Sequence, residues 1–194
     1  MKYYKLTDYY PRDVFFSFSD KNSIQKSNLE IGLNSSSKDK LIYTVDKFDS
    51  YVGEYDILPT IGAPLVSLKL KQIIEKFNIE DCQFIPAIIE DTSSGKINEY
   101  FFAMNILNSV ECLDKEKSEI KPLMKSFPNG PIKINNLFFK SDKLKDHCIV
   151  RMLESKSIIV VNFTLLEKCK EFRVKGTQFV KEGNQLSPSF VDYN

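Results

Sequence analysis

The stretch QFIPAIIEDTSSGKINEYFFAMNI, residues 83–106, decides the fold class of this chain. Its first part, residues 83–89, has the β-branched and aromatic content of a strand. Residues 92–96 have the composition of a hairpin loop, and residues 100–106 then alternate as a long strand with one strongly apolar face. Because Pro86 cannot donate a hydrogen bond to a neighbouring strand, we expect it at a sheet edge or a bulge. The stretch therefore predicts two long strands that pair as a hairpin.

The clearest helix is expected just before this hairpin, beginning near Pro64. Proline is favoured at the first helical position, because its missing N–H would have no intrahelical partner there. Apolar residues then recur with helical spacing on one side, and polar residues fill the other. The apolar stripe consists of Val66, Leu70, Ile73, Ile74 and Phe77. Such a helix is expected to pack across a sheet.

A second helix is expected over residues 164–172. Thr164 and Glu167 have the spacing of a capping box, in which side chains satisfy the free N–H groups at the start of a helix. The inner face is expected to consist of Leu165, Leu166, Cys169 and Phe172. Gly176 ends this region, and a last short strand is expected at residues 178–180.

Strand-like runs elsewhere in the chain outnumber these two helices. They lie at residues 14–18, 41–45, 132–139, 148–153 and 157–161. Because strands and helices do not alternate regularly, we expect an α+β fold, with mostly antiparallel sheets and two main helices packed on them. The strongest turn falls at residues 126–131. The length suits a single domain over residues 1–194, with a polar tail at residues 183–194 that can fray.

The charge balance argues against nucleic acid as a partner. Lysine and arginine total 27 and aspartate and glutamate total 26, which gives a formal net charge of +1. A protein that neutralises many phosphates normally carries a basic excess, because its affinity comes from counterion release. No apolar run approaches the ~20 residues of a membrane span, and the first residues lack the apolar core of a signal peptide. We therefore expect a cytoplasmic protein that binds neither nucleic acid nor membrane.

The sequence contains few residues for histidine, cysteine or glycine-loop chemistry. The single histidine, His147, precedes Cys148, and adjacent strand residues point to opposite faces, so a Cys–His dyad is not expected. The four cysteines form no CxxC pair, and we expect them to be reduced and buried. They are Cys82, Cys112, Cys148 and Cys169. No glycine-rich phosphate loop occurs, and we predict no metal centre and no cofactor.

Acidic residues are the remaining candidates for catalysis, because the sequence does not show which of them meet in space. The clusters are Glu54 with Asp56, Glu90 with Asp91, and Glu111 with Asp114 and Glu116. A glycosidase would need two such acids facing each other across a sugar-sized gap. No further motif accompanies these clusters, and we expect solvated loops. A carboxylate-dependent hydrolase is the enzymatic alternative.

One segment carries a pattern typical of a known family. Residues 56–67, DILPTIGAPLVS, have the pattern D-x-L-P…G-x-P-L-V-S leading into a helix. Supporting matches lie at residues 84–86, 105–106, 146–151, 158–161 and 175–179. Over about residues 50–182, the chain therefore resembles the immunity proteins of bacterial polymorphic toxin systems, specifically the eleventh immunity family, formerly DUF1629.

The resemblance implies a protein that binds a cognate toxin domain and blocks it, with no chemistry of its own. The motif residues, which we expect to be structural, are Asp56, Pro59, Gly62, Pro64 and Ser67. Gly62 can supply an unusual backbone turn, Pro64 is expected to start the helix, and Ser67 to lie in its first turn. Candidates for the contact surface are the tyrosine-rich N-terminal stretch and the acidic loops. A binding module without a toxin partner is the other alternative, and the sequence predicts no oligomeric state.

Overall fold

The computed structural model describes residues 1–36, 39–77, 79–127, 130 and 132–184 of the chain. The helices are α1 (Lys26–Glu30), α2 (Leu68–Glu75) and α3 (Phe163–Glu171), with 3₁₀ turns at Ile79–Asp81 and Ser141–Leu144. The strands of the first half are β1 (Tyr3–Asp8), β2 (Phe16–Phe18), β3 (Leu41–Val45), β4 (Ile57–Leu58), β5 (Thr60–Ile61), β6 (Leu65–Ser67) and β7 (Cys82–Asp91). Those of the second half are β8 (Ile97–Ile106), β9 (Ser109–Val110), β10 (Glu119–Pro122), β11 (Ile132–Asn136), β12 (Ile149–Met152), β13 (Ser155–Asn162) and β14 (Thr177–Lys181).

The largest sheet has seven strands, in the order β4-β6-β8-β7-β3-β2-β5. Its two outermost strands, β4 and β5, are separated in sequence only by Pro59. One short segment, residues 57–61, therefore supplies both edges, and the sheet closes into a barrel-like ring. We call the buried residues inside it the barrel core: Tyr10, Phe16, Leu29, Leu41, Tyr43, Val45, Val52, Leu58, Ala63, Leu65, Ile85, Ala87, Ile89, Phe101 and Ala103.

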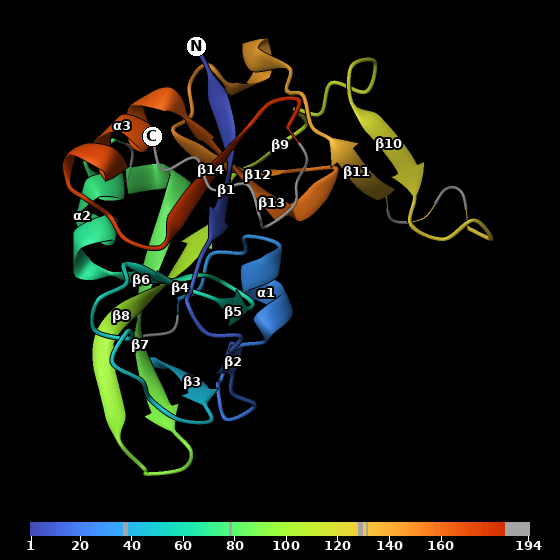
Figure 1. The fold of residues 1–194 in the computed structure, drawn as a ribbon. Helices are drawn as coiled ribbons and strands as arrows, with labels where there is room; N and C mark the ends of the chain where they lie inside the picture. The colour runs from blue at the N-terminus through green and yellow to red at the C-terminus, as the bar shows by residue number, and fades with distance from the viewer. Residues whose placement is uncertain (37–38, 78, 128–129, 131, 185–194) are drawn as a thin grey trace.

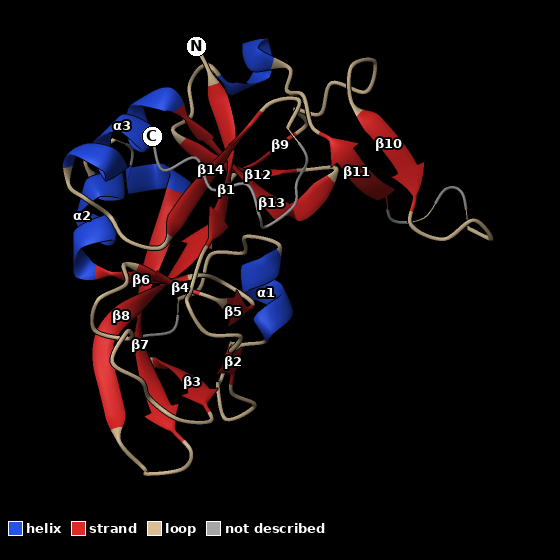
Figure 2. Ribbon diagram, in the orientation of Figure 1, coloured by secondary structure: helices blue, strands red, loops and turns tan. Residues whose placement is uncertain are grey.

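The second sheet has five strands, in the order β14-β1-β13-β12-β9, and apolar residues cover both of its faces. One face packs against α2, α3 and the outer side of the barrel in what we call the helix-side core (Figure 2). This core includes Leu6, Val66, Ile73, Met104, Ile159 and Leu165. The other face packs in the arm-side core, which includes Cys112, Leu113, Ile134, Leu137, Val150 and Val160. The helix-side core joins the two sheets, because both contribute residues to it.

The first predicted helix is present, but its expected start at Pro64 is wrong. Helix α2 begins four residues later, because residues 65–67 form β6 and pair with β8. Ser67 is the N-cap, and its Oγ accepts a hydrogen bond from the N–H of Leu70 at 3.2 Å. Val66 therefore belongs to a strand, although it is buried as the apolar stripe required.

The second predicted helix is also present, and its expected capping box is wrong. Asn162 is the N-cap of α3, because its Oδ1 accepts from the N–H of Leu165 at 2.9 Å. Leu165 and Cys169 are buried on the inner face, as predicted. Phe172 instead follows the last helical residue and is 44% exposed, so it does not belong to that face.

The predicted central hairpin is confirmed as β7 and β8, which pair antiparallel along most of their length. Pro86 lies one residue before Ala87, the first residue of β7 that pairs with β3, and the register of the hairpin shifts between Ala87 and Ile89. The expected irregularity is therefore present directly after Pro86, whereas β7 is an interior strand of the sheet and not an edge. Without an N–H, Pro86 is tolerated because no strand on the β3 side pairs with it among the described residues.

The prediction of one apolar face on the long strand is wrong. Met104 belongs to the helix-side core and Ala103 to the barrel core, so both faces of β8 are buried at this end. Toward the hairpin loop the strand leaves this packing, and Tyr100 is 81% exposed. A strand that lies between two cores requires apolar residues on both faces. In the sequence, the alternation of large and small side chains looks like a single apolar face.

The other predicted strands are present as β2, β3, β11, β12, β13 and β14, with some ends shifted. The α+β class fits, but the sheets are mixed, because β3 with β7, β2 with β5 and β9 with β12 are parallel pairs. The third helix, α1, was not expected. Residues 128–129, 131 and 185–194, which include much of the strong turn and of the C-terminal tail, lie outside the described residues.

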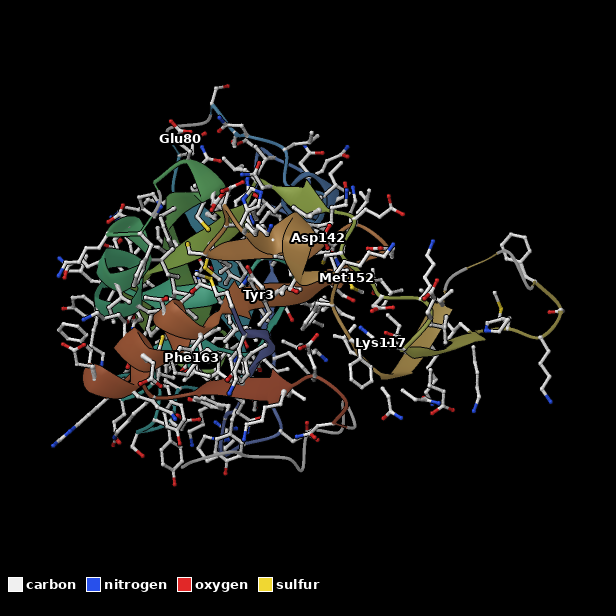
Figure 3. The ribbon with its side chains drawn as sticks, turned by 90° about the horizontal axis from the view of Figure 1, so that it is seen from above. Tyr3, Glu80, Lys117, Asp142, Met152 and Phe163 are labelled. Carbon is white, nitrogen blue, oxygen red and sulfur yellow. The ribbon has the colours of Figure 1, made fainter. Side chains whose placement is uncertain are left out.

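Strands β10 and β11 form a two-stranded sheet of their own, which we call the arm. The arm projects from the side of the molecule in two perpendicular views (Figure 1 and Figure 3). Ile134 is buried in the arm-side core, and Ile120 and Ile132 pack against it. The arm is therefore anchored by one apolar side, and the rest of it extends beyond the two larger sheets.

Candidate functional site

The family-like motif is organised around the buried carboxylate of Asp56. Its Oδ1 accepts a hydrogen bond from the Ser67 hydroxyl at 2.6 Å, and its Oδ2 accepts from the Lys175 N–H at 2.8 Å. The ammonium of Lys69 lies 2.7 Å from the same Oδ2, and the Asp56 side chain is only 8% exposed. Asp56 therefore ties the start of α2 to the turn before β14.

The other motif residues fix the backbone between the barrel strands. The carbonyl of Pro59 accepts from the N–H of Phe16 at 2.8 Å, and the carbonyl of Pro64 accepts from the N–H of Met104 at 2.8 Å. Gly62, between them, has a φ of 127°, which residues with a Cβ rarely adopt. The two prolines thus accept hydrogen bonds from β2 and from β8, which lie near the two ends of the strand order of the barrel sheet.

A cleft of about 1000 Å³ lies beside the motif, between the barrel and the ends of β1, β13 and β14. Pro59, Gly62 and Pro64 contribute to its wall, whereas Asp56 and Ser67 do not. The N-terminal stretch lines it over residues 5–10 and 12–15. The motif and the tyrosine-rich N-terminus, which are separate features of the sequence, therefore meet at one concave surface.

The cleft carries charges of both signs. Its ionisable residues other than tyrosine are Lys5, Asp8, Arg12, Asp13, Glu30, Arg151 and Lys156. Partial desolvation raises the pKa of Asp8 and lowers that of Lys5, while the attraction between the two groups opposes both shifts. Four cations against three acids leave little net charge, so the cleft does not favour a strongly charged ligand of either sign.

Arg151 is the most deeply buried charged residue of the cleft, at 4% exposure. Its guanidinium donates to three backbone carbonyls, those of Leu29, Ile106 and Lys156, at 3.0–3.3 Å. Burial lowers its pKa, and the nearby carboxylate of Glu30 opposes that shift. Arg151 therefore joins α1, the end of β8 and the start of β13, and each of its three nitrogens donates one hydrogen bond to a backbone carbonyl.

Aromatic side chains gather at the N-terminal rim of the cleft. Tyr10 packs edge-on against Tyr51 and Tyr55, with ring centroids 6.3 and 5.2 Å apart. The Tyr10 hydroxyl donates to Asp49 at 2.6 Å, and Arg12 donates to the other oxygen of the same carboxylate at 2.8 Å. Burial, followed by the bond to Asp49, raises the pKa of Tyr10 far above its ordinary range. Exposed apolar residues on the rim are Tyr9, Phe15 and Ile31.

The three acid clusters predicted from the sequence lie in different parts of the fold. Glu54 forms an ion pair with Lys175 at 3.1 Å, and Glu90 with Lys21 at 3.4 Å. In the third cluster, Asp114 pairs with Lys117 at 3.0 Å. Each cluster therefore engages a lysine of this chain.

Asp91 holds the loop of the central hairpin. Its carboxylate accepts from the N–H groups of Phe48, Ser93 and Ser94 at 2.8–3.0 Å. These hydrogen bonds, with that from Phe48 the largest contribution, keep the pKa of Asp91 well below its usual range.

His147 and the cysteines do not form a catalytic pair. The Nδ1 of His147 lies 3.2 Å from the Oδ1 of Asp81, while Cys148 is buried in the helix-side core. All four cysteines are free and buried, as predicted. Burial raises the pKa of Cys148 to about 11 and those of Cys112 and Cys169 to about 12. Cys112 lies in the arm-side core and the other three in the helix-side core.

Sequence reasoning missed Asp8 and Arg151 as members of a cleft. Neither belongs to a local motif with a chemical meaning, because their neighbours in the cleft come from distant segments. A basic residue between apolar strand residues, as in Ile149–Met152, was the available signal for a buried arginine. Among the described residues, no group of three or more His, Cys, Asp and Glu side chains is arranged to hold a metal ion.

The comparisons with known proteins place the chain in a family. In the described part of the chain, no helix combines the length and apolar character needed to cross a membrane. A search of curated proteins found no match. A family model described as the immunity protein family (Imm11) matches residues 41–184, which is more than half of the chain and includes both the motif and the arm. The chain therefore belongs to the Imm11 immunity protein family.

Proposed function

We propose that this protein binds a cognate bacterial toxin domain and neutralises it by protein–protein contact in the cytoplasm. The family match over residues 41–184 carries the proposal. In this role the protein acts as one unit and performs no chemistry of its own. An interface of ordinary size, about 1,600 Å² in total, would be sufficient for tight binding.

The internal contacts of the charged side chains support a binding role. Asp56 and Asp91 use their carboxylates to hold backbone segments, and Arg151 uses its guanidinium in the same way. A general acid or base must exchange a proton with a bound substrate, whereas these three side chains direct their hydrogen bonds to other parts of the fold. The motif residues are thus explained by the fold that they stabilise, and we propose that their role is structural.

The direct test is co-expression with the C-terminal domain encoded by the neighbouring open reading frame. Expression of that domain alone should arrest growth, and this protein should restore growth and co-purify with the domain. A toxic domain that this protein neither neutralises nor binds would contradict the proposal. It would leave the chain as a binding module without a toxin partner.

A second candidate, a carboxylate-dependent hydrolase, rests on Asp8. This carboxyl lines the cleft and has a raised pKa, as a general acid requires, and Asp13 and Glu30 line the same cleft. The substitution Asp8→Asn separates the two functions. Under the proposed function the Asp8→Asn variant restores growth as well as the wild type, whereas under the hydrolase alternative protection is lost while binding remains.

A further inference from the structure

We infer that the arm is the element that contacts the toxin domain, and that its basic face docks on an acidic protein surface. The inference rests on the proposed function and assigns it a surface. It comes from the register of β10 and β11, from the exposed residues at the arm's end, and from its charge.

The register places two lysines directly opposite each other. Lys121 of β10 pairs with Lys133 of β11, on the side of the ribbon opposite to Ile120 and Ile134. Both lysines are exposed. Like charges at directly opposed positions destabilise an antiparallel pair. Nothing in the packing of the arm requires this arrangement, because the apolar side faces the arm-side core.

Internal partners neutralise only part of this charge. Glu119 lies 2.6 Å from the ammonium of Lys121 and also accepts from the amide of Asn135 at 3.0 Å. Among the ion pairs of the described residues, none involves Lys125 or Lys133. The arm therefore presents a cationic face that an acidic partner would complete.

Apolar side chains extend beyond the paired strands. Leu123, Met124 and Phe127 follow β10 and are 60%, 51% and 55% exposed. A two-stranded hairpin is only marginally stable in water by itself. Because these apolar side chains remain exposed, they bury little area and add little to the stability of the arm. Methionine and phenylalanine are among the residue types enriched in protein–protein interfaces, and the neighbouring lysines suit the polar rim that surrounds such a centre.

The amount of charge favours a protein over nucleic acid or membrane. Residues 119–136 contain three lysines against one glutamate, a net charge of +2. Nucleic-acid binding commonly involves about 6–10 phosphate contacts, and recognition of an anionic membrane about 4–8 clustered basic residues. The arm lies entirely inside the family match, residues 41–184, whereas the N-terminal part of the cleft wall, residues 5–10 and 12–15, lies outside it. The family-wide role is therefore better served by the arm than by the N-terminal rim.

The test is a charge reversal of the arm, the double variant Lys121→Glu/Lys133→Glu. Its matched control is Lys47→Glu/Lys96→Glu, which makes the same change in net charge at two exposed lysines on the barrel. Binding to the purified C-terminal domain from the neighbouring open reading frame is measured by calorimetry and stopped flow at several salt concentrations. Circular dichroism verifies that all variants are folded.

The reversal should weaken binding about 100-fold or more, mainly through slower association, and should abolish the salt dependence of the association rate. The control should bind within about twofold of the wild type. A third variant, Leu123→Ser/Met124→Ser, should weaken binding about 10-fold or more with an unchanged salt dependence.

Failure of the inference is distinguishable from failure of the proposed function. If wild-type protein binds the domain and the arm reversal binds equally well, the arm is not the contact and the proposed function stands. If wild-type protein does not bind, the proposed function itself fails. Arm-dependent binding of the wild type to a DNA duplex, to phosphatidylserine vesicles or to a second copy of this chain would also overturn the inference.

Discussion

The barrel and the arm are both built from β-strands, but they differ in how their sheet edges are paired and in how their charged side chains are neutralised. In the barrel, residues 57–61 occupy both edges of the seven-stranded sheet, and the neighbouring Asp56 is buried with three partners. In the arm, both strands are edges, and Lys121 faces Lys133. The first arrangement satisfies the Asp56 carboxylate with partners from this chain. The second leaves the ammonium of Lys133 without an ion pair among the described residues.

The difference separates positions that hold the fold together from positions that are available to contact a partner. A recognisable motif in such a family can mark the residues that close the fold, because those positions have strict backbone and hydrogen-bond requirements. In the interaction that we propose, recognition is carried instead by a segment that folds with unbalanced charge and exposed apolar side chains. Substitutions in the two regions should therefore affect different quantities.

The largest effect on stability is expected from Asp56→Ala. The substitution leaves the Ser67 hydroxyl, the Lys175 N–H and the Lys69 ammonium without their shared acceptor. We expect a loss of about 3 kcal/mol in the free energy of unfolding, measured by urea denaturation. The control is Glu54→Ala, since the pair of Glu54 with Lys175 is solvent-exposed and should change stability by less than about 0.5 kcal/mol. Equal effects would show that the motif acid has no special role in the fold.

A somewhat smaller effect is expected from Gly176→Ala. Gly176 has a φ of 91°, and a Cβ there would lie 3.0 Å from the carbonyl oxygen of Ile57 in β4 and 2.9 Å from the ring of Tyr55. We expect a loss of about 2 kcal/mol from strain and crowding, measured by thermal and chemical denaturation. Gly53→Ala is the matched control, because a Cβ at Gly53 meets nothing within 4 Å. That variant should be neutral or up to about 1 kcal/mol more stable.

A third prediction concerns the pH dependence of barrel stability. The pKa of Asp91 is lowered in the folded state, so its contribution is fully present above the unfolded value of about 3.9 and is lost as the pH falls through the folded pKa. The variant Asp91→Asn should therefore melt at a lower temperature than the wild type at pH 6. The difference should shrink as the pH falls below about 4. Asp20→Asn, at an exposed position, serves as the control, and a gap that stays constant with pH would contradict this assignment.

The smallest effect on stability is expected in the arm, and with the opposite sign. Lys133→Glu replaces an opposed pair of lysines by a pair of opposite charges, which favours β10 and β11 by about 0.2–1 kcal/mol. Amide exchange in the arm should slow by up to about fivefold while global stability is unchanged. Toxin binding should nevertheless weaken. A variant that stabilises the arm and also strengthens binding would contradict the proposed acidic partner.

Most of the strands could be predicted from the sequence, because their apolar residues recur with a clear period. The central hairpin and the last strand, β14, are examples, and their loops and glycines have strong local preferences. The starts of the helices could not be predicted as well. Pro64 is favourable for a first helical turn, yet pairing of residues 65–67 with β8 overrides that local preference.

The ring closure and the cleft could not be predicted from one sequence. The strands β4 and β5 have two residues each, too short for any periodicity, and they pair with strands on opposite sides of the sheet. The cleft residues Asp8 and Arg151 are separated by most of the chain. For the arm, the alternation of isoleucine and lysine in β11 was visible, but the opposition of the two lysines depends on register and became clear only in the structure.

The distribution of the four cysteines has a practical consequence for following how the molecule opens. The barrel core contains no cysteine, the helix-side core contains three and the arm-side core contains one. Buried thiols with a raised pKa react slowly with alkylating reagents until the surrounding layer separates. Labelling of Cys112 would report opening of the arm-side core. Labelling of the other three thiols would report opening of the helix-side core. The four native thiols are therefore kinetic probes for opening of the helix-side core and of the arm-side core. Local opening of the barrel core would not change the labelling, because that core contains no cysteine.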